Sequence, residues 1–476
     1  MKLLFKSTLI AFLLFEIAFS FIRYTHFTTD GDLVSITLPN RSYNTVLTDP
    51  FALNVLLHDS IYAAPNRYFV HRAMVSYFNS VPLLLQAFVS PIDSIYYSCA
   101  LAKTLIHFFI VFLLAVYCTG KWNLKDTNFL LAAALITPLI QTFGFNQLMG
   151  IIDHSISYTF FYAFSLSLVL LFFLPIFLKR IYGKKIPAIV NVVLIFLAII
   201  IAFSGPLNPV VVILICTLLF FDAFISDYRE NSSPNWYKKI SDSIRSLPTD
   251  YWLVYGFATL LCLYSVFVGR NNAENFWESI PILERYSRLP TGIFHQFTFK
   301  IGMPLLVLMS VINALIIKKR FLTVLGKKLL HFLKWIFILS LIYLALLPLG
   351  GYRSYRFYIL RSDTQMPITL SFMLFYGVST FFILKNIISG KKIYYAALII
   401  FTLIYLNADT SIKYENNNER KALETISASK DKIVLVESDC TVLSWIIIGD
   451  YNDSREKAVM LKRWGVIKEM KYYYQK

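Results

Sequence analysis

The chain is predicted to be an all-α polytopic membrane protein, and three observations support this fold class. Of its 476 residues, 57% are hydrophobic and only 15% are charged, which is far from the composition of a soluble domain. Apolar runs recur from end to end, and basic connections alternate with connections that lack lysine and arginine. The expected architecture is about eleven transmembrane helices, a large outer loop after the first, and a small extramembrane α/β unit at the C-terminus.

The apolar runs define a multi-span membrane domain at residues 1–408. A hydrocarbon core of roughly 30 Å requires about 20 predominantly apolar residues in a helix. Runs near this length lie at residues 3–22, 98–118, 129–145, 156–178, 186–204, 210–225, 251–268, 301–317, 329–349, 367–384 and 393–406. The first run also resembles a signal peptide, but Glu16 within it and Phe21-Ile22 beyond it fit a retained helix better.

The connections between these runs predict their orientation. "TGKWNLKD", "LKRIYGKK" and "KKRFLTVLGKK" are rich in basic residues, whereas "SGPLNP" contains none. Because lysine and arginine collect in cytoplasmic loops, the N-terminus is predicted to be cytoplasmic. An odd number of spans then places the C-terminal tail outside. The expected location is the plasma membrane, which is the inner membrane in bacteria.

The net charge of +17 does not indicate nucleic-acid binding. Residues 409–476 carry about twelve basic and about eleven acidic groups, so the excess belongs to the membrane domain, where basic loops are normal. The five cysteines show neither a disulfide framework nor a zinc spacing. No Walker loop, GxSxG, HExxH or Rossmann motif stands in its required context, which argues against soluble nucleotide chemistry.

Four polar segments stand out on the predicted outer face, at residues 23–82, 270–300, 350–366 and 409–476. The tail pattern predicts a helix through "NNNERKALETISAS", a strand at "KIVLVES", a second strand at "LSWIIIG" and a helix from Asp453 through "REKAVMLKRWG". A unit this small is expected to depend on the membrane domain for stability.

Asp30-Gly31-Asp32 follows the first predicted helix closely enough to meet a lipid-linked headgroup at the membrane surface. A carboxylate near a poorly solvated interface can take a proton from a sugar hydroxyl as a general base. The same three residues also fit a turn held by an Asx hydrogen bond. Two aspartates flanking a glycine could hold a divalent cation, although no cofactor is certain. No metal-ligand set is assigned.

Basic residues of the outer loop form a second candidate feature. Arg67, His71 and Arg72 are grouped, and on a helix Arg67 and His71 would share one face. The forked donors of arginine match phosphate or pyrophosphate oxygens. Alternatively, these side chains reach the headgroups of anionic lipids.

A third feature is the segment "YRSYRFYILRSD", which contains Arg353, Arg356 and Arg361. Three arginines so close together on the outer side oppose the usual topological bias, so they indicate a local role in binding a phosphate or a headgroup.

Asp153 and His154 open the fourth predicted helix. They could form an acid–base pair or orient a substrate, or Asp153 could cap the helix.

This layout resembles the GT-C superfamily of integral-membrane glycosyltransferases. The resemblance covers the whole chain as architecture, and its one motif is Asp30-Gly31-Asp32 at the position of the catalytic acidic residue. Members often have adjacent acidic residues there, whereas here a glycine separates them, and Asp30 is favoured weakly over Asp32 as the base. The resemblance implies a lipid-linked donor on polyprenyl phosphate and a surface glycan or lipid acceptor. It implies substrate-binding roles for Arg67, Arg353 and Arg356.

Two other functions are compatible with the sequence. A flippase or transporter of a lipid-linked saccharide would carry polar residues at mid-membrane and often shows internal repeats. A surface-polysaccharide polymerase or ligase would also face outward, but with its large outer loops in the later half of the chain. Here the longest outer loop between helices follows the first span, which favours a glycosyltransferase.

Overall fold

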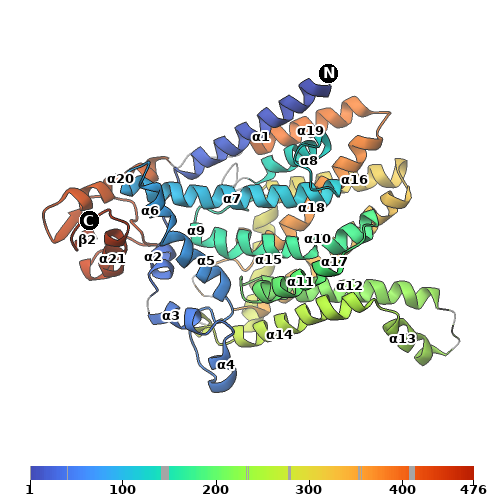
Figure 1. The fold of residues 1–476 in the computed structure, drawn as a ribbon, viewed down its shortest axis with the longest axis horizontal. Coiled ribbons are helices and arrows are strands. Elements are labelled where there is room, and N and C mark those ends of the chain that lie inside the picture. The colour runs from blue at the N-terminus through green and yellow to red at the C-terminus, as the bar shows by residue number, and fades with distance from the viewer. Residues whose placement is uncertain are drawn as a thin grey trace.

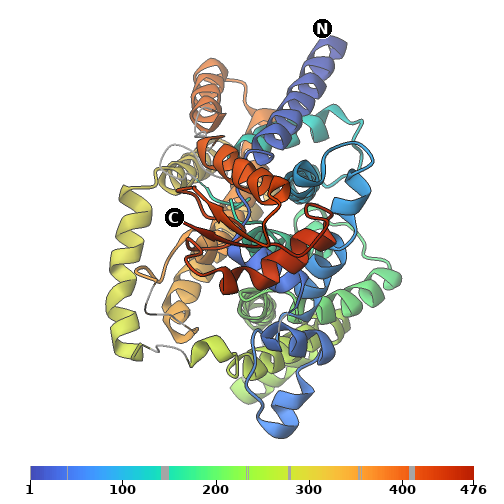
Figure 2. The same cartoon turned by 90° about the vertical axis from the view of Figure 1, so that its left-hand side faces the viewer.

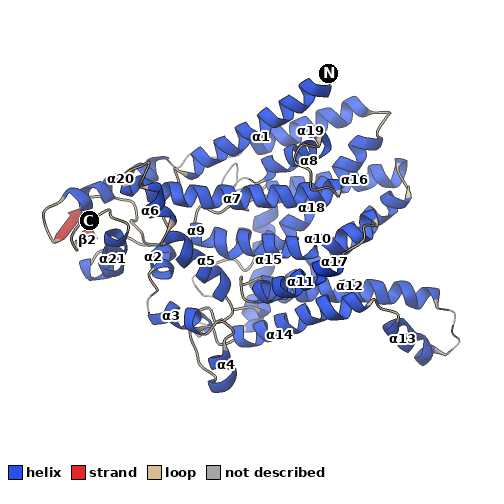
Figure 3. Cartoon of the chain, viewed as in Figure 1, coloured by secondary structure: helices blue, strands red, loops and turns tan. Residues whose placement is uncertain are grey.

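The structure, a computed structural model, describes residues 2–39, 41–140, 149–231, 233, 235–276, 280–351, 354, 356–406 and 413–476. Helices make up most of these residues and pack lengthwise into a bundle (Figures 1 and 3). The predicted all-α membrane fold is confirmed in this coarse form.

Eight helical stretches in the described part of the chain are long and apolar enough to cross a membrane. They contain α1 (Lys2–Tyr24), α7 (Pro91–Thr119), α10 (Ser165–Tyr182), α12 (Asn208–Glu230), α14 (Phe257–Gly269), α16 (Gly302–Arg320), α17 (Val324–Leu346) and α18 (Ser362–Asn386). The other three predicted spans are also helical but shorter: α8 (Thr127–Ile136), α11 (Ala188–Ala202) and α19 (Lys391–Leu406). The count of eleven spans stays a prediction.

The helices α7 and α18 lie at the centre of the bundle. Most of their residues are buried, whereas only a minority of the residues of α1, α12 and α17 are buried. A helix that is apolar all round is stable only where protein or lipid covers every face. The central helices are covered by protein, and the outer helices leave their apolar faces for lipid.

Short helices cover one end of the bundle, on the left in Figure 1, which we call the capped end. They are α2 (Gly31–Thr37), α3 (Arg41–Thr48), α4 (Leu53–His58), α5 (Tyr68–Phe78), α6 (Val81–Leu85) and α9 (Ile156–Tyr158). Asp49 stabilises the start of α4, because its carboxylate accepts the backbone N–H groups of Leu53 at 2.8 Å and Asn54 at 2.9 Å. Elsewhere, α13 (Trp236–Arg245) lies at the opposite end, and α15 (Ile282–Thr298) precedes α16.

Residues 413–476, the C-terminal unit, also lie at the capped end, where Figure 2 shows them in front of the bundle. They comprise α20 (Lys413–Ala428), β1 (Ile433–Val436), α21 (Arg455–Arg463) and β2 (Tyr472–Gln475), with the two strands parallel. The second strand predicted at "LSWIIIG" is wrong. Leu443 there has a φ of 49°, which an extended strand cannot accommodate, and the partner of β1 is β2.

The C-terminal unit is anchored to the membrane domain through Trp464. This indole is fully buried, and its Nε1 donates to the carbonyl of Phe78 at 2.9 Å. Gln86 Nε2 donates in return to the Trp464 carbonyl at 2.6 Å. Burying a tryptophan with its N–H satisfied is a strong contribution to association. The C-terminal unit is therefore packed against α5 and α6.

Candidate functional site

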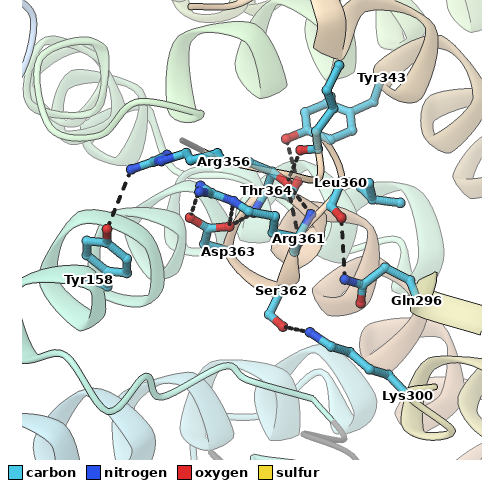
Figure 4. Close-up of polar contacts among 11 residues, drawn as sticks. Tyr158, Gln296, Lys300, Tyr343, Arg356, Leu360, Arg361, Ser362, Asp363 and Thr364 are labelled. Atoms are coloured by element: carbon cyan, nitrogen blue, oxygen red, sulfur yellow. Dashed lines mark hydrogen bonds and ion pairs between the residues drawn. The ribbon is translucent and has the colours of Figure 1, made fainter. Parts of the chain in front are cut away.

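Charged and aromatic side chains from segments far apart in the sequence gather at the capped end. The start of α2 contributes Asp32, the turn before α9 contributes Asp153, and the approach to α18 contributes Arg356, Arg361 and Asp363. Figure 4 shows the part of this group around the start of α18. We call it the polar cluster.

Asp30 lies beside this cluster but is fully occupied by hydrogen bonds. It is buried and caps α2, where Oδ1 accepts the backbone N–H groups of Asp32 at 3.0 Å and Leu33 at 2.9 Å. Oδ2 accepts the Ser155 hydroxyl at 2.8 Å and the Ser157 N–H at 3.0 Å, and the Ser157 hydroxyl donates to Oδ1 at 2.8 Å. A carboxylate has roughly four lone-pair sites, so these five donors occupy all of its capacity to accept hydrogen bonds. The Asp32 N–H to Asp30 bond is the Asx hydrogen bond of the alternative interpretation. Asp30 also joins α2 to α9 and has little capacity left to accept a substrate proton.

Asp32 is only half-buried and faces the C-terminal unit. Its Oδ1 accepts the indole N–H of Trp445 at 3.1 Å. Gly31 is required here, because a Cβ at this position would lie 2.5 Å from Trp445 Cδ1 and 2.6 Å from the Trp445 backbone nitrogen. The motif thus does not present two equivalent carboxylates to one cation. Asp32 is instead hydrogen-bonded to Trp445.

Two tyrosines line the cluster from the helix that begins at α9. The ring of Tyr158 lies 5.8 Å from that of Trp445 and 5.8 Å from that of Tyr162. Tyr162 lies in a π-helical segment, η2 (Thr159–Phe164), which interrupts the span before α10. Such π-helical segments are frequent at functional sites because they turn side chains out of the regular helical register. Here the interruption falls beside the charged residues.

Arginines from two segments lie near these tyrosines. Arg356 and Arg361 precede α18, whereas Arg67 precedes α5, and its guanidinium lies 5.9 Å from the centre of the Phe161 ring. Arg356 also donates to the Tyr158 hydroxyl at 3.5 Å, and Arg361 binds Asp363 through two donors at 3.1 and 2.5 Å. This concentration of guanidinium groups is suited to an anion with several oxygens.

Lys300 adds a further positive charge next to α18. Its Nζ donates to the Ser362 hydroxyl at 2.8 Å (Figure 4). Burial lowers the pKa of this ammonium, and the carboxylates of Asp363 and Asp153 oppose that change. No local pattern indicated a role for Lys300, because it lies 62 residues before Ser362 in the chain.

Asp153 has an environment suited to proton transfer. Burial raises the pKa of its carboxyl from 3.8 to about 6, and the neighbouring carboxylates of Asp363 and Asp30 add to the rise. The Ser155 N–H, donated to Asp153 Oδ1 at 2.8 Å, and the Lys103 ammonium oppose it. The side chain that caps α9 is that of Ser155, so the capping role proposed for Asp153 is wrong in detail.

His154 is not placed as an acid–base partner of Asp153. Burial and, to a lesser extent, the nearby Lys103 ammonium lower the pKa of its imidazole to about 2, so the ring stays neutral at ordinary pH. The ring packs on Phe27 with centroids 4.2 Å apart. Lys103 donates to the His154 carbonyl and lies 4.3 Å from the centre of the same phenylalanine ring. His154 therefore contributes packing and backbone contacts.

The remaining predicted site residues have different surroundings. His71 is buried with its ring 5.5 Å from that of Tyr43 and 5.0 Å from that of Phe161, and burial lowers its pKa to about 4. A neutral ring packed in this way is poorly suited to binding phosphate. Arg72 is exposed on α5, and Arg353 lies outside the described residues.

Sequence reasoning missed the contribution of the C-terminal unit. Glu419 on α20 is fully buried and accepts the Thr29 N–H at 3.0 Å and the Tyr96 hydroxyl at 2.9 Å, together with the Thr29 hydroxyl. It therefore fixes the residue that precedes Asp30. Burial raises the Glu419 pKa from 4.5 to about 7. A glutamate in a polar helix and a tryptophan in an apolar run gave no local signal of these roles.

Within the described residues, no group of three or more histidine, cysteine, aspartate or glutamate side chains is arranged to hold a metal ion. No family model matches the chain, and neither a curated protein nor a solved structure matches it at a significant level. Function has to be inferred from the chemistry of the site itself.

Proposed function

We propose that this chain is a membrane glycosyltransferase that moves a sugar from a polyprenyl-phosphate donor to a surface glycan or lipid acceptor. We further propose that the capped end faces the outside of the plasma membrane. The alternation of basic and non-basic connections supports this orientation.

The observation that carries the proposal is the group of arginines at the capped end: Arg356 donates to the Tyr158 hydroxyl, Arg361 follows in the same segment, and Arg67 from another segment lies over the ring of Phe161. A polyprenyl-phosphate donor keeps its phosphate at the membrane surface and its chain in the bilayer. Bidentate guanidinium donors would bind that phosphate and stabilise the negative charge that grows on it as the sugar leaves. A site for such a donor needs these cations at the end of a helix bundle.

Asp32 is the proposed general base. Its carboxylate would accept the proton of an acceptor hydroxyl, whose oxygen forms a bond to the anomeric carbon as the bond from that carbon to the lipid phosphate breaks. Asp32 is half-buried and stands beside Trp445, whose indole is 52% exposed and offers a flat apolar face to a sugar ring. Asp30 is proposed to be a positioning residue, because its hydrogen bonds hold α2 against α9.

Asp153 is the second candidate for the base. A pKa of about 6 is close to the value that favours proton transfer near neutral pH. Its nearest charges are those of Lys103 and Asp363, so a role in orienting the donor is equally consistent with its surroundings. Comparing single variants of Asp32 and Asp153 separates these roles.

The position of the cluster favours a transferase over a flippase. A flippase for a lipid-linked saccharide is expected to bind its cargo midway across the membrane, where helices are broken. Here the arginines and carboxylates lie at the starts of α9 and α18, under the C-terminal unit.

The proposal is tested by comparing the masses of cell-surface glycans from cells with and without the gene. Loss of a sugar-sized mass on deletion, restored by the wild-type chain but not by Asp32→Asn, supports it. Asp431→Asn, which changes an exposed carboxylate of the C-terminal unit, is the matched control and should restore the mass. Altered glycan chain length would instead indicate a polymerase, and accumulation of lipid-linked precursor inside the cell would indicate a flippase.

A further inference from the structure

A long apolar cleft lies inside the bundle between α10, α12, α17 and α18, with a volume of about 600 Å³. Its lining follows one face of α12 from Val211 to Glu230. At about 1.5 Å per residue, these two positions are roughly 28 Å apart, which is close to the thickness of a hydrocarbon core. The cleft is therefore elongated along the membrane normal.

Most of the cleft is lined by leucine, isoleucine, valine and phenylalanine, but the end farthest from the capped end is charged. Arg180, near the C-terminus of α10, pairs with Asp222 at 2.6 Å. His331 Nε2 and Trp335 Nε1 lie 2.7 and 3.0 Å from the other oxygen of the same carboxylate. Arg180 and Asp222 thus neutralise each other and form an ion pair at the charged end of the cleft.

Charges of both signs also lie at this end of the cleft, beside the Arg180–Asp222 ion pair. Lys328 lines the cleft and donates from Nζ to the Arg180 carbonyl at 2.7 Å. Asp227 and Glu230, one and two turns beyond Asp222 on α12, add two carboxylates. The charged end of the cleft therefore contains an ammonium and two further carboxylates, next to its apolar length.

We propose that this cleft binds one phospholipid with a zwitterionic, primary-ammonium headgroup, that is, phosphatidylethanolamine. The lipid phosphate would meet Lys328, the lipid ammonium would meet Asp227 and Glu230, and one acyl chain would occupy the apolar length of the cleft. A volume of about 600 Å³ lies within the range of about 300–1,000 Å³ that is usual for ligand sites.

The groups at the charged end of the cleft distinguish this lipid from purely anionic ones. Phosphatidylglycerol and polyprenyl phosphate both bring negative charge without a cation, and the carboxylates of Asp227 and Glu230 lie at this end of the cleft in addition to the Arg180–Asp222 pair. The charged end of the cleft is also separate from the polar cluster. Arg180 lies in the last turn of α10, whereas the polar cluster lies near the opposite end of that helix. The inference therefore stands or falls independently of the proposed transferase activity.

The test is native mass spectrometry of the full-length protein, stripped of lipid in detergent and titrated separately with phosphatidylethanolamine, phosphatidylglycerol and a polyprenyl phosphate. We expect one phosphatidylethanolamine to bind more tightly than either anionic lipid. Asp227→Asn combined with Glu230→Gln should lower the phosphatidylethanolamine affinity about fivefold and should raise or leave unchanged that for phosphatidylglycerol.

A second variant tests the acyl chain. Ala223→Phe places a ring in the cleft without altering charge and should abolish the bound lipid, because it fills the space the chain needs. The matched control, Asp431→Asn combined with Glu424→Gln, removes two exposed carboxylates elsewhere and should leave binding unchanged. Equal binding of the three lipids, or full binding by both cleft variants while they melt like the wild type, would overturn the proposal.

Discussion

The indole N–H of Trp445 donates to the Asp32 carboxylate at 3.1 Å, although 413 residues separate the two in the sequence. This bond joins the C-terminal unit to the first loop after α1. Tyr158 lies against the other side of the indole, with ring centroids 5.8 Å apart. The C-terminal unit is therefore part of the candidate site rather than an appendage to the membrane domain.

Trp445→Ala is expected to lower transfer about tenfold or more. The change removes a hydrogen bond to a charged acceptor, which is typically worth about 1.5–3 kcal/mol, together with an exposed aromatic face. The measurement is the rate at which membranes containing the variant add sugar to the surface glycan. Trp122→Ala, at another exposed tryptophan, is the control. A Trp445→Ala variant as fast as the wild type would show that the indole plays no part.

Asp30→Asn and Asp32→Asn are expected to fail in different ways. Asp30→Asn weakens five hydrogen bonds and should reduce stability by about 1–3 kcal/mol, which a lower unfolding temperature in detergent would show. Asp32→Asn should melt like the wild type yet lose transfer by a factor of about 10²–10⁴, as expected when a general base is removed. An active Asp32→Asn enzyme combined with an inactive but stable Asp153→Asn enzyme would assign the base to Asp153.

Gly31→Ala is expected to destabilise the junction between α2 and the C-terminal unit. In a helix, alanine is favoured over glycine by about 1 kcal/mol, so helix propensity alone predicts stabilisation. The opposite is expected here, because the added Cβ would lie 2.6 Å from the Trp445 backbone nitrogen, which cannot rotate away. Thermal unfolding and transfer should both decrease. Gly449→Ala is the control, since a Cβ there meets nothing within 4 Å.

The sequence was sufficient for features that depend on local pattern. Among the described residues, each of the eleven apolar ranges contains a helix, because a long apolar run in a membrane has to satisfy its own backbone hydrogen bonds. The predicted range 129–145 is helical as far as residue 139, and its residues 141–145 lie outside the described residues. The Asx turn at Asp30 and the stabilisation of α4 by Asp49 also follow from short-range spacing. The strand at β1 was predicted for the same reason, from the short β-branched run in "KIVLVES".

Features that depend on distant pairing could not be predicted in this way. Nothing local to Asp30 indicates that Ser155 and Ser157 occupy its second oxygen, so it was chosen over Asp32 as the base. The run "LSWIIIG" has strand-like composition, but Leu443 has a positive φ and Trp445 is required beside Asp32. In both cases a tertiary contact overrides the local preference.

Arg356→Ala is expected to lower transfer about a hundredfold while leaving the unfolding temperature within a few degrees of the wild type. Loss of one donor to a developing charge typically has an effect of this size. Arg356→Lys should restore only part of the rate, because a lysine has one point charge in place of two parallel donors. Arg72→Ala, at the exposed arginine of α5, is the matched control. Similar losses in the Arg72 and Arg356 variants would indicate a general effect of surface charge.

Docking of the C-terminal unit is expected to weaken as pH rises. Glu419 is buried and its pKa is raised from 4.5 to about 7, so the folded protein binds its proton more tightly than the unfolded chain does. This contribution to stability is fully present below about pH 4.5 and is lost as pH rises through about 7, which amounts to about 2 kcal/mol between roughly pH 5 and 8. The unfolding temperature in detergent should therefore be lower at the higher pH.

Glu419→Gln, which imitates the protonated side chain, should remove most of this pH dependence and melt above the wild type at about pH 8. Glu424→Gln on the exposed side of α20 should leave it intact. An unchanged pH dependence in Glu419→Gln would show that another group governs docking, and it would separate the stability of the C-terminal unit from the residue that fixes Thr29 beside the candidate site.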